Sequence, residues 1–185
     1  VIFDCRLFMD VAISTLVGKV RWKTAMLLRS RSSFSMEDMV VQYKQQILSV
    51  VEYRTGAIYH ATTSILRKLD KVQDSFLRQL GIDTECALLD FNLAPLSMRR
   101  DIALLGVLHR AAIGEGPAQF REHFYRKAGS LRMYDVLEGT HPSLLMRRSI
   151  WGLVSIYNRL GGARDCSSVG DFQKLLQERA KRVVD

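Results

Sequence analysis

The sequence predicts an all-α protein, and three observations support this fold class. Apolar residues recur three and four positions apart over several long segments, which is the spacing of one helix face. Residues that start and stop helices bound those segments. A strand-rich segment, an internal repeat and a low-complexity tract are not found. We expect a helical bundle, then a second small helical region, with a short β-like stub at the N-terminus.

The N-terminal stub comprises residues 1–7. Its first part, Val1–Asp4, is a short β-like run that stops at Asp4. The chain begins with Val1 and not with Met, so we interpret the start as a cut inside a longer open reading frame. The stub would then be the end of a strand whose sheet lies before this chain.

Three amphipathic helices are expected over residues 8–82 and predict a small bundle. The first runs from about Asp10, as its N-cap, to Arg29. The second follows an approximate capping box at Ser35 and Asp38 and extends to about Tyr59. The third ends near Gly81, a typical C-cap glycine. The hydroxyl residues that could open this third helix are Thr62, Thr63 and Ser64.

The remaining residues predict shorter helices. Residues 83–127 form a helical extension, residues 128–148 a linker or loop rich in Gly and Pro, and residues 149–185 a C-terminal helical pair. The helices expected in these regions are Asp83–Leu89, Ser97–Ile113, Gln119–Lys127, Ser149–Leu160 and Asp171–Val184.

The composition and the net charge restrict the classes of function that this chain can have. A net charge of +8 favours polyanionic partners. Three widely spaced Cys and four isolated His do not predict a disulfide framework or a zinc site. Apolar runs fall short of the roughly 20 residues of a membrane span, and a secretory signal is not seen. We therefore expect an intracellular protein, in the nucleus or the cytoplasm, that is not secreted and has no membrane partner.

Catalytic motifs are not apparent. Two-metal nucleotidyl transfer needs closely placed carboxylates, and the sequence has no Asp-Asp pair. It also lacks a Gly-rich phosphate loop and a Gly-x-Ser-x-Gly elbow. The expectation is that this chain by itself is not an enzyme, has no catalytic residue, and holds no metal or other cofactor.

An ordered series of short motifs runs through the whole chain. One example is Val51-Glu52-Tyr53, and another is Leu93-Ala94-Pro95-Leu96 followed by two arginines. Together the motifs resemble the C-terminal part, thumb and post-thumb, of the reverse transcriptase of non-LTR (LINE-type) retrotransposons. Arg54 and Gly161 depart from the family's usual Gly and Pro. The segments that carry the resemblance are Ile2–Leu7, Lys23–Arg29, Tyr43–Tyr53, Leu69–Arg78, Leu93–Arg100 and Arg148–Gln177.

The resemblance implies a role in gripping nucleic acid. The parent protein would be an RNA-directed DNA polymerase with Mg²⁺ in a palm that this chain lacks. Its thumb would hold an RNA template and an RNA–DNA or DNA duplex, beside the parent's palm and fingers. Sequence-independent grip needs contacts to phosphates, which Lys and Arg provide. The candidate nucleic-acid-binding residues are Lys19, Arg21, Lys23, Arg29 and Arg31 on the first helix and Arg67, Lys68, Lys71 and Arg78 on the third.

Other interpretations remain open. The same cations could be solvated charges, with Asp70 and Asp74 forming weak local pairs on the third helix. We expect Trp22 and Trp151 to pack inside the helical regions and not to stack on bases. The chain could also be a stand-alone helical protein-interaction module, or an inactive remnant of an element.

Overall fold

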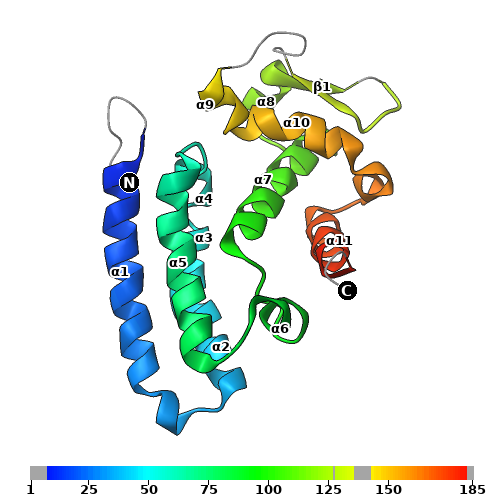
Figure 1. The fold of residues 1–185 in the computed structure, drawn as a ribbon. Coiled ribbons are helices and arrows are strands. Elements are labelled where there is room, and N and C mark those ends of the chain that lie inside the picture. The colour runs from blue at the N-terminus through cyan, green and yellow to red at the C-terminus, as the bar shows by residue number, and fades with distance from the viewer. Residues whose placement is uncertain (1–7, 127, 136–142, 183–185) are drawn as a thin grey trace. The chain divides into compact units, whose positions relative to one another are not determined.

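The computed structural model describes residues 8–126, 128–135 and 143–182, and the chain is all-α, as the sequence predicts (Figure 1). One two-stranded hairpin is the exception among these residues. The strand-like stub expected at residues 1–7 lies outside the described residues. The chain divides into two compact units between Arg100 and Asp101, and each unit is considered by itself.

The regular elements in the described part of the first unit are all helices. Ser35 caps α2, because its hydroxyl oxygen accepts from the backbone N–H of Asp38 at 3.1 Å. Thr62 caps α5 in the same way, and Gly81 ends α5 with φ 72°. Local sequence thus set these ends as expected. The elements are α1 (Asp10–Arg29), η1 (Arg31–Ser33), α2 (Met36–Tyr43), η2 (Lys44–Leu48), α3 (Ser49–Glu52), α4 (Thr55–Ile58), α5 (Thr63–Leu80), α6 (Thr84–Leu89) and the start of α7 (Leu96–Ala112).

The start of α1 differs from the prediction. Met9, with φ 60°, takes the N-cap position and gives no side-chain cap, whereas Asp10 is the first helical residue. The Asp10 carboxylate instead accepts a hydrogen bond from the Lys68 ammonium of α5 at 2.7 Å. This hydrogen bond and charge lower the pKa of Asp10. A long-range ion pair therefore uses the side chain that was expected to cap the helix.

The second predicted helix is not continuous. It contains one π-helical turn, η2, and it breaks at Tyr53 and Arg54 before the short helix α4. A π turn accommodates an extra residue and rotates the side chains that follow it. Sequence periodicity did not predict this turn.

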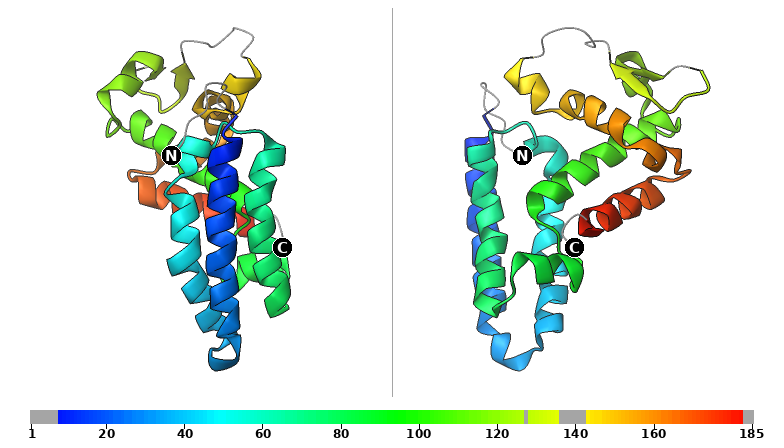
Figure 2. Two further views of the ribbon diagram at one scale, coloured as in Figure 1. Left: turned by 90° about the vertical axis from the view of Figure 1, so that its left-hand side faces the viewer. Right: turned by 45° about the vertical axis from the view of Figure 1, so that its right-hand side comes forward.

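The core of the first unit is formed by α1, α2, η2 and α5. Tyr43 and Phe76 stack at its centre with ring centroids 4.2 Å apart, and both are fully buried. Burial raises the pKa of Tyr43. α1 packs against both α5 and the α2–α3 segment, and the left view of Figure 2 shows it in front of them. Leu93 and Leu96 belong to the same core, which explains why this unit continues to Arg100 and does not end at residue 82.

The second unit begins inside α7 and contains the largest departures from the sequence prediction. Gln119–Lys127 is not one helix, because α8 ends at His123 and a strand follows. The expected linker, 128–148, contains a strand and a helix among its described residues. The strands pair antiparallel, with Tyr125 opposite Tyr134. The elements are α8 (Ala118–His123), β1 (Phe124–Arg126), β2 (Met133–Asp135), α9 (Leu144–Arg147), α10 (Ile150–Arg159), η3 (Gly161–Asp165) and α11 (Val169–Arg182).

Side chains of α10 hold the hairpin in place. The Asn158 side chain accepts from the Met133 N–H at 2.9 Å and donates to its carbonyl oxygen at 2.6 Å. Trp151 packs near Phe124, with ring centroids 5.6 Å apart, so the prediction that Trp151 is a packing residue is confirmed. A polar side chain that satisfies both backbone groups of Met133 makes a short strand possible in a loop-like sequence.

His109 lies at the centre of the second unit. It is 0% exposed and stacks on Phe172 with a centroid distance of 4.2 Å. Nε2 donates to the carbonyl oxygen of Cys166 at 3.0 Å, because a carbonyl only accepts. Nδ1 of the neutral ring therefore accepts from the Tyr157 hydroxyl at 3.1 Å. Burial lowers the pKa of His109, so the folded unit favours the uncharged form of the ring.

We expect acid to destabilise the second unit through His109. The unfolded chain protonates this ring near pH 6.5, whereas the folded unit resists protonation. The stabilisation is complete above pH 6.5 and declines as the pH falls below it, by at most about 1.4 kcal/mol per pH unit. Urea unfolding at several pH values, followed by Trp151 fluorescence in a Trp22→Phe background, measures this. His109→Gln keeps a donor and an acceptor, and its stability should depend less on pH in the same window. An equal pH dependence would contradict the prediction.

Candidate nucleic-acid interface

The exposed surface of the first unit contains a segment without acidic residues. Residues 11–36 include five Lys or Arg and no Asp or Glu. These residues form most of α1 and all of η1. A positively charged surface without interspersed carboxylates attracts polyanions over several ångströms. The segment is therefore a cationic feature on which a site for a polyanion can be built.

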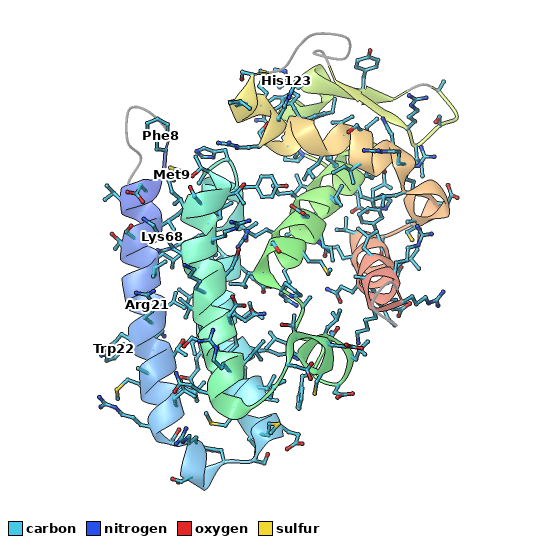
Figure 3. The ribbon with its side chains drawn as sticks, in the orientation of Figure 1. Phe8, Met9, Arg21, Trp22, Lys68 and His123 are labelled. Atoms are coloured by element: carbon cyan, nitrogen blue, oxygen red, sulfur yellow. The ribbon has the colours of Figure 1, made fainter. Side chains whose placement is uncertain are left out.

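The outer face of α1 is apolar, although it faces solvent. Val11, Trp22 and Met26 are 55%, 65% and 45% exposed. Gly18 lies four residues before Trp22 on the same face, and a Cβ added there would meet nothing within 4 Å. Trp22 projects away from α5 in Figure 3. We call the face formed by Val11, Gly18, Trp22 and Met26 the α1 strip.

The exposure of Trp22 contradicts the prediction that it packs inside the bundle. The buried side of α1 is set by Ile13, Leu16, Val20 and Leu27. Trp22 follows Val20 by two residues, which places it about 200° round the helix from the buried side. Helical periodicity alone could have found this, because a large aromatic residue opposite the buried face must point to solvent. Trp22 is a functional candidate that the sequence prediction assigned to the core.

Cations lie on both edges of the α1 strip. Arg21 is exposed on the edge opposite to Lys19, which is also exposed. Lys23 is half-buried and donates to the Gln46 carbonyl oxygen at 3.4 Å, a long and weak contact. Within the described residues, no ion pair engages these three side chains. They are the part of the predicted site that the structure brings together.

Arg29 and Arg31 lie at the far end of α1. Arg29 is in its last turn, where a cation is favourable with the negative end of the helix dipole. Arg31 is exposed in η1. Both can extend the cationic edge, but Arg29 also has this local structural explanation.

The predicted cations of α5 are arranged less favourably. Lys68 is held by Asp10 in an ion pair of 2.7 Å. Arg67, Lys71 and Arg78 are exposed. Near Arg78, burial raises the pKa of Asp74, and this carboxylate also feels the charge of Asp70. The cluster on α5 is therefore mixed in sign and weaker than that on α1.

Asp70 does not form the local pair that was one of the open interpretations. Its carboxylate is held by both terminal nitrogens of Arg100, at 2.8 and 3.1 Å, and not by a neighbour on α5. Arg99 pairs with Glu52 in a similar way. These two arginines, which belong to a motif of the resemblance, attach the start of α7 to the bundle, so their role within the first unit is structural.

Two further residues near Lys19 were not predicted as a site. Tyr53 is 90% exposed, and Arg54 follows it at the break between α3 and α4. They line an open pocket together with Lys19, Ser49 and Val50. Both belong to a motif of the resemblance, which gave them no binding role, and their exposure follows from the break in the helix.

The described residues contain no group of three or more His, Cys, Asp or Glu side chains placed to hold a metal ion. None of the helices described is long and apolar enough to cross a membrane.

No protein-family model matches the sequence, and searches of curated proteins and of solved structures find no significant similarity.

Proposed function

We propose that this chain is the thumb-like part of an RNA-directed DNA polymerase of the non-LTR retrotransposon type, which binds the template–primer duplex. The observation that carries the proposal is the α1 strip, whose cations on both edges have no ion-pair partner among the described residues, in a segment free of carboxylates. The ordered motifs described above support the assignment to a polymerase. The chemistry then belongs to a palm, with its Mg²⁺, outside this chain.

The shape of α1 suits a surface that grips any duplex. Gly18 lets the backbone of a ligand approach closely, because it has no side chain. Trp22 and Met26 offer apolar area to sugars and groove edges without selecting a base. Lys19 and Arg21 then reach phosphates on either side of the strip. Such contacts fix position without reading sequence, as a polymerase requires.

The salt dependence of binding tests this proposal. The chain should bind an RNA–DNA hybrid with an affinity that falls steeply between about 50 and 200 mM salt. Replacing Lys19, Arg21 and Lys23 together by Gln should reduce the slope of log K against log salt by about 2.7, or roughly 0.9 for each lost phosphate contact. Fluorescence anisotropy with a labelled hybrid measures both slopes.

A matched variant separates position from total charge. The exposed cations Arg110, Lys174 and Arg182, all in the second unit, are replaced by Gln to give the same net charge. This control should keep the wild-type slope. Equal slopes for both triple variants, or no binding of the hybrid at low salt, would overturn the proposal.

The same strip favours a second candidate, a helical protein-interaction module. Val11, Trp22 and Met26 form exposed apolar area at helical spacing, as in helices that dock on partner grooves. Sedimentation of the chain would favour this alternative if it showed self-association that is insensitive to salt and abolished by Trp22→Ser. The polymerase proposal requires instead that Trp22→Ser weakens hybrid binding.

A further inference from the structure

The pocket beside α1 has a volume of about 430 Å³ and is open to solvent. Its lining comes from two places far apart in the sequence: Lys19 on α1, and a segment of α3 and the residues after it. We call it the Tyr53 pocket. The volume is within the range of small-ligand sites, about 300–1,000 Å³. The residues that line it are Lys19, Ser49, Val50, Tyr53 and Arg54.

The chemistry of the Tyr53 pocket combines an aromatic face with two cations. Tyr53 is 90% exposed, which leaves nearly its whole ring available. Lys19 and Arg54 have no ion-pair partner among the described residues. The nearest carboxylate in sequence, Glu52, is engaged by Arg99. The pocket is therefore cationic, and its cations are not neutralised by this carboxylate.

The backbone near the pocket is irregular. The π turn η2 ends at Leu48, directly before Ser49, and π turns are frequent at functional sites. The helix then ends at Glu52, and Tyr53 lies at the break. The Ser49 hydroxyl donates to the Gln45 carbonyl oxygen at 2.6 Å, so its oxygen is left to accept a hydrogen bond. The pocket thus offers a ring, two cations and one acceptor.

We infer that the Tyr53 pocket binds one nucleotide of a single-stranded segment. The base stacks on Tyr53, and Lys19 and Arg54 hold its phosphate. Ser49 can accept from a sugar hydroxyl. A base inside a duplex cannot offer a free face to the ring, so the ligand is a single strand. Lys19 is also on the edge of the α1 strip, so a strand leaving a gripped duplex reaches the pocket first; this placement rests on the proposed function.

Two labelled ligands test the inference. One is a blunt RNA–DNA hybrid, and the other is the same hybrid with a single-stranded RNA overhang of about six nucleotides, within the site sizes of single-strand binders. The wild-type chain should bind the overhang ligand roughly tenfold more tightly, the effect expected of one stacked base. Anisotropy titrations at one fixed salt concentration give both values of Kd.

Single substitutions show which residues cause the preference for the overhang ligand. Tyr53→Ala and Arg54→Gln should remove the preference for the overhang and leave the Kd for the blunt hybrid unchanged. Tyr53→Phe keeps the ring and should keep the preference. Trp22→Ala should weaken the binding of both ligands equally, because Trp22 contacts the duplex that both ligands contain. Tyr125→Ala removes another exposed Tyr, in the second unit, and should change neither Kd. Circular dichroism confirms that each variant is folded.

The outcomes distinguish the two proposals. Binding of the blunt hybrid with no gain from the overhang, or a gain that survives Tyr53→Ala, overturns the pocket inference alone. Failure to bind the blunt hybrid, with Tyr53-dependent binding of a single-stranded oligonucleotide, overturns the proposed duplex grip and supports the pocket. Displacement of the overhang by equimolar free adenosine monophosphate, or by a phosphotyrosyl peptide, overturns the assignment to a strand.

Discussion

Replacing Phe76 by Ala should lower the free energy of unfolding of the first unit by about 3–5 kcal/mol. Phe76 is fully buried and stacks on Tyr43 at the centre of the core. The substitution removes the ring from a closely packed core. It leaves a cavity that the surrounding helices cannot fill. This is a large part of the total stability of a typical domain, about 5–15 kcal/mol. Urea unfolding followed by far-ultraviolet circular dichroism measures the change.

Phe34 provides a control for this substitution. It is 45% exposed and follows η1, so Phe34→Ala should change the free energy of unfolding by about 0.5 kcal/mol or less. The consequence for function is indirect, because the core around Phe76 supports α1 and with it the α1 strip. A loss below about 1 kcal/mol for Phe76→Ala would show that the ring is not closely packed.

Replacing Arg100 by Met should cost about 3 kcal/mol in the free energy of unfolding. The Arg100 side chain is 5% exposed and that of Asp70 is 25% exposed. Without the guanidinium group, the Asp70 carboxylate keeps its desolvation cost and loses two charge-assisted hydrogen bonds. The charge of Asp70 would also act more strongly on Asp74, whose pKa it already raises.

A second substitution tests whether the lost pair is the cause. Asp70→Leu combined with Arg100→Met should recover most of the stability, because no buried charge is left alone. The more exposed pair of Arg99 and Glu52 serves as comparison, and Arg99→Met should cost about 1 kcal/mol or less. A double variant as unstable as Arg100→Met would contradict this explanation.

The candidate site could be predicted in part. The sequence identified the cations of the first helix as candidates, and Lys19 and Arg21 are exposed on either edge of the α1 strip. The sequence did not show that Lys68 is engaged by Asp10, because the two are 58 residues apart. It also did not place Tyr53 beside Lys19. Such pairings depend on how the helices pack, and helical periodicity contains no information about the partner.

The fold, like the candidate site, could be predicted only in part. The sequence determined the end of α1 at Arg29, the cap at Ser35 and the end of α5 at Gly81, and it narrowed the start of α5 to three residues that include Thr62, because these features depend on hydrogen bonds within one helical turn. Tertiary structure alone decided the hairpin, which Asn158 of α10 supports across 25 residues. It likewise decided that Asp70 pairs with Arg100, 30 residues away. Local rules specify helices, whereas charge pairing and the exposed pocket follow from long-range packing.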